Sequence, residues 1–223
     1  MTFGAVFPRV MRPTFGPGLA GAADAANWWE AGGASGCVAA WQAKSAASYP
    51  ASKVNLVSPG TYDLTTGVDF SWDATGWTGD GTKWLNTNLV GAAGGTFAVW
   101  FSGVTGGYVG GVRAAANQTL ALWPATTASD RRYYKASFTN VAGAPFSTGS
   151  MAIAGTNCYK SGVADGTIGE FLYAPTVAFY IGAANTNPAA STPVVGKILA
   201  AGYWNNALTE TQMAAIEAEV NAL

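Results

Sequence analysis

The stretch GKILAAGYWNNALTETQMAAIEAEVNAL, residues 196–223, decides the fold of this chain. It begins with an apolar run that predicts a β-strand and continues into a short amphipathic helix. Thr209 is a natural N-cap, and Gln212 three residues later completes a capping box. Leu208 and Met213 occupy the two positions of a hydrophobic staple around that cap. The stretch therefore predicts a strand followed by one capped helix.

The predicted helix has an apolar face, formed at helical spacing by Met213, Ile216, Val220 and Leu223. We expect this face to seal one edge of a β-sandwich. Three of the chain's five glutamates also lie in the helix, and we expect them on its solvent-facing surface.

Upstream of this stretch, about a dozen short segments rich in β-branched and aromatic residues are separated by turn residues. There is no βαβ rhythm and no repeat of fixed period, which disfavours a propeller or a β-helix. The pattern predicts an all-β fold: a two-sheet antiparallel jelly-roll sandwich over residues 37–223, with one short C-terminal helix. The predicted strands include 37–42, 70–73, 84–87, 95–103, 108–112, 118–123, 132–138, 150–155, 157–160, 178–182 and 197–204.

Residues 1–36 differ from the rest, because prolines and glycines interrupt a series of single apolar residues. Proline removes a backbone donor, so neither a helix nor a central strand is favoured here. Disorder is one interpretation, but disordered segments are usually poor in aromatic residues. We therefore predict an extended N-terminal arm that binds another subunit during assembly through Phe3, Phe7, Met11, Phe15, Trp28 and Trp29.

The composition excludes several classes of function. The chain of 223 residues has no histidine, which excludes Ser-His-Asp and Cys-His catalysis. Its net charge is −1 and its basic residues are scattered, so we expect no nucleic-acid partner. No apolar run reaches the length of a membrane span or of a signal peptide's core, so we expect no membrane insertion.

The two cysteines, Cys37 and Cys158, do not make a disulfide framework in a chain of this length. A single bridge would form only if two strands brought them together. We favour the alternative, in which both are small buried apolar residues.

The acidic residues give no sign of hydrolase chemistry or of a metal site. Jelly-roll glucanases use two carboxylates that flank the scissile bond, and no confident strand here carries acids at alternating positions. We therefore predict that the chain is not an enzyme and has no catalytic residues. Asp73, Asp80 and Asn86 lie near a glycine-rich turn and could bind calcium, but such residues also form turns. We favour the turns and predict no metal and no cofactor.

Sugar binding would require an exposed aromatic ring beside amide or carboxylate groups. Tyr108, Trp123, Asn185 and Asn187 are the candidate glycan-binding residues. The alternative is that the aromatic residues pack in the core or at its rim. The stretch 131–134 (RRYY) is either part of an interface, where arginine and tyrosine are enriched, or a solvated strand end.

Three segments together resemble the concanavalin A-like, laminin G-like jelly-roll family. Residues 96–103 (TFAVWFSG) resemble the family's early core strand, and 158–167 (CYKSGVADGT) resemble its tyrosine-x-asparagine-glycine-valine hairpin. In that hairpin Lys160 and Ser161 replace the usual x-Asn pair. Residues 179–213 resemble the family's closing strand and capped helix. The resemblance covers about residues 70–223.

The upstream residues 39–42, 52–62 and 72–77 are similar to the lead-in of such domains in tailed-phage structural proteins. This resemblance implies a non-enzymatic virion protein: a capsid decoration, fibre or tail component. Its implied partners are other virion proteins and further copies of the chain. A carbohydrate-binding module for host-surface glycan is the alternative function, and the two are compatible.

Overall fold

The computed structural model describes residues 27–115, 118–126, 130–135, 138–141, 143–169 and 174–223. Most of the secondary structure within them is β-strand, as the sequence predicted. The elements in chain order are η1 (Trp28–Gly33), β1 (Cys37–Gln42), α1 (Tyr49–Ser52), β2 (Thr65–Val68), β3 (Ser71–Asp73), β4 (Gly76–Asp80), β5 (Trp84–Asn86), β6 (Thr96–Gly106), β7 (Gly110–Arg113), β8 (Thr119–Trp123), β9 (Arg132–Lys135), β10 (Phe138–Val141), β11 (Gly149–Ala154), β12 (Asn157–Lys160), β13 (Val163–Thr167), β14 (Tyr180–Ile181), β15 (Ala184–Asn185), β16 (Ala190–Ser191), β17 (Val195–Trp204) and α2 (Glu210–Ala222).

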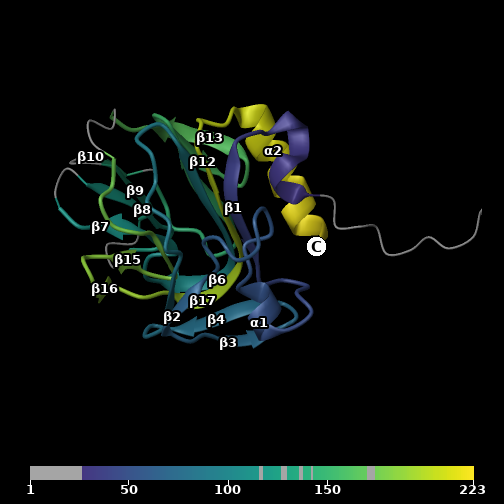
Figure 1. The fold of residues 1–223 in the computed structure, drawn as a ribbon. Coiled ribbons are helices and arrows are strands. Elements are labelled where there is room, and N and C mark those ends of the chain that lie inside the picture. The colour runs from purple at the N-terminus through teal and green to yellow at the C-terminus, as the bar shows by residue number, and fades with distance from the viewer. Residues whose placement is uncertain (1–26, 116–117, 127–129, 136–137, 142, 170–173) are drawn as a thin grey trace, which may run out of the picture.

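The strands form two sheets that make a β-sandwich, which confirms the predicted fold class (Figure 1). The eight-stranded sheet has the order β13-β12-β11-β6-β17-β4-β3, with β1 also paired to β17. The nine-stranded sheet has the order β10-β9-β8-β7-β14-β5-β2, with the β15–β16 hairpin attached to β7. Neighbouring strands in these two sheet orders are antiparallel to each other, whereas β15 pairs with β7 in the parallel direction.

The long strands β6 and β17 lie side by side at the centre of the eight-stranded sheet. Alternate residues of a strand point to opposite faces, so Phe97, Val99 and Phe101 of β6 enter the space between the sheets. Ala98 and Trp100 of the same strand lie on the outer face. Side chains from both sheets fill the space between them, among them Trp41, Trp77, Leu85, Val112, Leu122, Tyr133, Ile153, Phe179, Ile198 and Tyr203.

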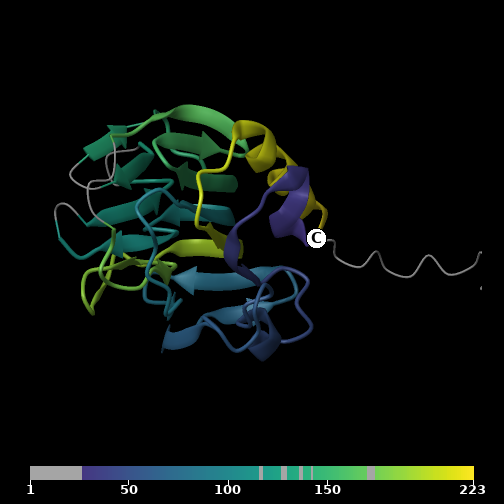
Figure 2. The same ribbon diagram turned by 45° about the horizontal axis from the view of Figure 1, so that its top comes forward.

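The outer face of the eight-stranded sheet is covered by η1 and α2, which lie together on one side of the molecule (Figure 2). Alanines dominate this face of the sheet, so the two helical segments can approach it closely. The ring of Trp28 lies 5.3 Å from that of Trp100 and 6.4 Å from that of Trp204, both in edge-to-face geometry. A second hydrophobic core therefore forms outside the sandwich.

The helix α2 begins as the sequence predicted. The Gln212 backbone N–H donates to Thr209 Oγ1 at 3.3 Å, and the Thr209 N–H donates to Gln212 Oε1 at 3.0 Å. Met213, Ile216 and Val220 are fully buried in the second core. The helix covers a face of the sandwich, however, and not an edge as expected. The small outward side chains of the sheet leave room for a helix there.

The predicted boundary between arm and body at residue 36 is corrected by the structure. Trp28 is 1% exposed and Trp29 is 8% exposed, so both belong to the folded body and not to an arm. The Trp204 indole N–H donates to the Trp29 carbonyl oxygen at 3.0 Å, which ties this segment to β17. The other predicted arm residues, Phe3, Phe7, Met11 and Phe15, lie outside the described residues.

One predicted strand, 132–138, is instead a hairpin. The strand β9 ends at Lys135, and β10 pairs back on it from Phe138, which lies opposite Lys135 in the register. Apolar periodicity alone did not reveal this reversal.

The two cysteines are thiols and do not form a disulfide. Cys158 is fully buried in the main core, as favoured from the sequence. Cys37 is half-buried, in contrast to the expectation that both cysteines are buried. Desolvation still raises the pKa of the Cys37 thiol to about 12, so it is a poor nucleophile at neutral pH.

Candidate functional site

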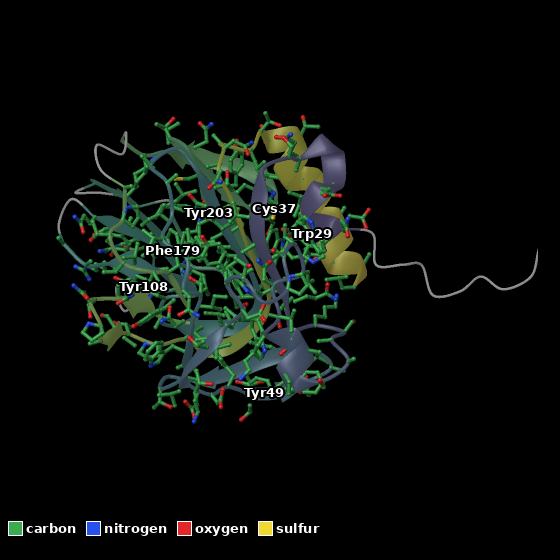
Figure 3. All side chains as sticks on the ribbon, in the orientation of Figure 1. Trp29, Cys37, Tyr49, Tyr108, Phe179 and Tyr203 are labelled. Atoms are coloured by element: carbon green, nitrogen blue, oxygen red, sulfur yellow. The ribbon has the colours of Figure 1, made fainter. Side chains whose placement is uncertain are left out.

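The structure brings two of the four candidate glycan-binding residues together. Tyr108 and Trp123 lie on the outer face of the nine-stranded sheet, with ring centroids 4.5 Å apart. Figure 3 shows Tyr108 on the side of the molecule away from Trp29 and the two helical segments. This face of the sandwich is therefore distinct from the one that η1 and α2 cover.

The register of three strands places a further aromatic residue beside this pair. Ala121 of β8 lies opposite Gly111 of β7 and Tyr134 of β9. Because neighbouring positions across a sheet share a face, Tyr134 points outward, as Ala121 does. The Tyr134 ring lies 5.9 Å from the Tyr108 ring and 6.3 Å from the Trp123 ring. We call Tyr108, Trp123, Tyr134 and Arg113 the aromatic patch.

The three rings of the aromatic patch differ in their exposure. Tyr108 is fully buried and forms its floor with Ala121 and Ala184. Burial raises the pKa of the Tyr108 hydroxyl to about 12, so it stays protonated at physiological pH. Trp123 and Tyr134 are half-buried and present part of their rings to solvent. The prediction for Tyr108 is thus corrected from a direct contact to a support for the two rings above it.

The indole nitrogen of Trp123 is the one buried side-chain polar atom without a hydrogen-bond partner among the described residues. A buried donor left without an acceptor costs about 1–3 kcal/mol. Such atoms are rare in native proteins and usually meet water or a ligand. Among the described residues, the floor of the patch therefore contains one buried donor without an acceptor.

Two contacts hold Arg113 against the rings of the aromatic patch. Its Nη1 donates to the Tyr108 hydroxyl at 3.2 Å, and its guanidinium carbon lies 5.8 Å from the centre of the Tyr134 ring. The side chain itself is exposed. Arg113 was not predicted from the sequence as a binding residue. Tyr134 was considered only as part of the stretch 131–134, for which an interface was one interpretation.

The two asparagine candidates lie in and beside the β15–β16 hairpin next to β7. Asn185 is buried, its Nδ2 donates to the Ala178 carbonyl at 2.7 Å, and its Oδ1 accepts from the Asn187 N–H at 2.9 Å. Its amide thus stabilises the loop and is not a free ligand group, which corrects the prediction. Asn187 is exposed at the loop.

The side chains of Arg131 and Arg132 bind two different aspartates. Arg131 forms a bidentate ion pair with Asp165 of β13 at 2.5 and 2.8 Å, which joins the two sheets. Arg132 forms a bidentate pair with Asp130 at 2.8 and 2.9 Å. Both guanidinium groups are therefore neutralised by carboxylates.

Tyr133 is the third member of the group that joins the two sheets. Its hydroxyl donates to Asp165 at 2.8 Å and also lies 2.9 Å from the Tyr159 carbonyl. Desolvation and the hydrogen bond to Asp165 raise the pKa of Tyr133, and the ring is fully buried. This arrangement disfavours a phenolate and keeps the ring from solvent, so the group is a structural tie.

The residues considered for calcium each form a turn, as favoured from the sequence. Asp73 accepts from the Thr75 N–H at 2.7 Å, Asp80 from the Thr82 N–H at 3.0 Å, and Asn86 from the Asn88 N–H at 2.9 Å. In the described part of the chain, no three His, Cys, Asp or Glu residues gather in a way that could hold a metal ion.

Two hollows lie elsewhere on the surface. One is shallow, about 590 Å³, and lies beside Val104 and Phe146. The other, about 260 Å³, lies between Trp29, Ala47 and Leu56. The side chains that line both are apolar or uncharged polar, so neither combines rings with a charged group as the aromatic patch does. Of the described helices, none is long and apolar enough to cross a membrane.

Comparisons with known proteins show the fold but no family. No protein-family model matches the chain, and no curated protein matches it significantly. The chain is similar to solved structures of Trypanosoma rangeli sialidase. A mutant that displays trans-sialidase activity has a TM-score of 0.53 and 13% identity, over 83% of this chain and 33% of that one. The sialidase in complex with sialic acid has a TM-score of 0.52 and 12% identity, over 82% and 32%.

These neighbours contradict the prediction that the chain is not an enzyme. They are sialidases, so the fold of this chain occurs in enzymes. The prediction rested on the missing histidine and the missing carboxylate pair, and neither excludes this class, because sialidases use a tyrosine nucleophile. The chain spans about a third of the length of these sialidases, and at this level of identity the likeness concerns the fold.

Proposed function

We propose that this chain is a carbohydrate-binding β-sandwich and that its ligand lies on the aromatic patch. The observation that carries the proposal is the pair of half-exposed rings, Trp123 and Tyr134, set on the outer face of the nine-stranded sheet. One face of a sugar ring consists of C–H groups, which pack well on aromatic rings. Binding sites commonly combine such apolar contacts with a few placed polar groups.

The polar groups of the aromatic patch suit a ligand rich in hydroxyl groups. Arg113 is exposed and has donors beyond the one bonded to Tyr108. A sugar hydroxyl or ring oxygen accepts hydrogen bonds from such donors. One of the sialidases with this fold was solved with sialic acid, which supports a saccharide as the class of ligand.

The first prediction tests this site with a glycan array followed by calorimetry on the glycans that bind. Trp123→Ala and Tyr134→Ala are each expected to weaken the Kd by about tenfold, because removing an aromatic anchor typically costs more than about 1 kcal/mol. Tyr134→Phe keeps the ring and should bind almost as the wild type does.

The matched control is Tyr62→Ala, which removes an exposed aromatic ring from a different part of the surface. It should leave the Kd unchanged. Urea unfolding of each variant shows whether a loss of binding reflects a loss of fold. An array without binding above background, or a Kd unchanged in both alanine variants, would refute the proposed site.

The expectation of a virion component stays a prediction. It rests on the similarity to phage structural domains and on a segment that is mostly outside the described residues. The predicted partners, other virion proteins and further copies of the chain, are likewise untested. A carbohydrate-binding domain displayed on a particle would satisfy both expectations, since many copies strengthen weak individual contacts.

A further inference from the structure

Arg113 differs in its charge environment from the other arginines that the structure describes. Arg131 and Arg132 each form a bidentate pair with an aspartate. Arg113 has no carboxylate partner among the described residues, and its one described hydrogen bond is to the neutral hydroxyl of Tyr108. Arg113 is exposed, lies beside the aromatic rings and has no counter-charge among the described residues. Such an arginine can bind an anion.

The guanidinium group of Arg113 is also oriented before any ligand arrives. The Tyr108 hydroxyl accepts from one of its nitrogens, and the Tyr134 ring lies beside it at 5.8 Å. Arginine presents its donors in a planar fork that matches a carboxylate with two parallel hydrogen bonds. Two contacts that limit the motion of the side chain lower the entropy that binding would cost.

We infer that the saccharide bound by the aromatic patch is acidic and that Arg113 binds its carboxylate; this inference rests on the proposed function. The ring of the acidic sugar packs on Trp123 and Tyr134, and its carboxylate lies at the exposed side of Arg113. Sialic acids and uronic acids both have this chemistry. The preference for an acid comes from Arg113, while the affinity for sugars in general comes from the rings.

Calorimetry with two acidic probes and their methyl esters tests the inference. Sialyllactose and trigalacturonate are each compared with the ester of the same sugar, so that only the charge differs within a pair. We expect at least one acid to bind about tenfold more tightly than its ester, because hydrogen bonds to charged groups are the stronger ones.

Substitutions at Arg113 then assign the preference to this residue. Arg113→Gln should make the acid and its ester bind alike, and Arg113→Lys should retain only part of the preference, because a lysine lacks the fork. Lys53→Gln removes one positive charge at the Asp69 ion pair and should keep the preference in full.

The outcomes separate the two proposals. Equal binding of each acid and its ester, or binding only of neutral sugars on the array, overturns the acidic ligand and leaves the proposed function standing. A preference that survives in Arg113→Gln also overturns the inference. An absence of binding by any sugar refutes the proposed function itself.

Discussion

At the scale of the residue, Glu217 is a charged side chain of α2 that is buried against the sheet. It was expected on the surface of the helix, but it is 8% exposed and points toward the sheet. Its Oε2 accepts from the Trp100 indole N–H at 2.7 Å and from Ser150 Oγ at 2.5 Å. A buried acceptor shared by two buried donors stabilises the docking of α2 on the sheet.

The second prediction follows from these hydrogen bonds. Glu217→Leu leaves the Trp100 and Ser150 donors without their acceptor and should lower the free energy of unfolding by about 3 kcal/mol. Glu217→Gln keeps an acceptor oxygen and should cost about 1 kcal/mol. Urea unfolding measures both.

The control for this prediction is Glu219→Gln, at an exposed position of the same helix. It should change the free energy of unfolding by less than about 0.5 kcal/mol. If Glu217→Leu is as stable as this control, the hydrogen bonds to Glu217 do not stabilise the packing.

At the scale of the element, η1 and α2 pack together as one unit, although they lie near opposite ends of the sequence. The Gln212 side chain, in the first turn of α2, donates to the Gly33 carbonyl at 3.2 Å. A Cβ on Gly32 would lie 2.8 Å from the Ala215 Cβ, so the two segments are in close contact. The positive φ of Gly32, +63°, also favours glycine there. Neither element buries its apolar residues without the other and the sheet.

The third prediction concerns truncation of the N-terminal segment. Removing residues 1–36 takes away Trp28 and Trp29 and should destabilise the protein by more than about 5 kcal/mol, since loss of one buried tryptophan side chain costs roughly 3–5 kcal/mol. Removing residues 1–26 should leave the unfolding transition nearly unchanged. Thermal unfolding followed by circular dichroism compares the two.

The two truncations also test the predicted arm. The protein that lacks residues 1–26 keeps an intact folded body, but it should no longer bind other copies or virion proteins. Equal stability of the two truncated proteins would show that Trp28 and Trp29 do not stabilise the folded body.

At the scale of the whole molecule, several carboxylates accept hydrogen bonds that favour their ionised form. The pKa of Asp73 is lowered to about 2, chiefly by hydrogen bonds from Thr75 and also by Lys197. Hydrogen bonds from Tyr49, Thr82 and Arg132 are the first causes of the lowered pKa values of three more aspartates, Asp69, Asp80 and Asp130. Each of these groups therefore favours the folded state while it is ionised.

The fourth prediction gives the sign of the pH dependence. A carboxyl with a lowered folded pKa contributes its full stability above the unfolded value, which is 3.8 for aspartate, and loses it as the pH falls through the folded value. The urea midpoint should be nearly constant from about pH 7 to about pH 5 and should fall between about pH 4 and about pH 2. Asp73→Asn should show a smaller fall over that range, and a midpoint that rises on acidification would contradict the assignment.

The sequence by itself determined the local features of this protein. The capping box at Thr209 and the turns at Asp73 and Asp80 depend on neighbours in the chain. Residue types and spacing are therefore enough to predict them. The β-sandwich also follows, because many short strands without helices between them have few ways to bury their apolar faces.

Only the tertiary structure decided the aromatic patch and the second core. Tyr134 and Arg113 lie 21 positions apart, and they meet because β8 pairs with both β7 and β9. Trp28 meets Trp204 because η1 lies over β17. Pairing register and the choice of sheet face are set by the packing of the whole chain. A residue's type therefore shows what it could bind, and the fold decides which residues it meets.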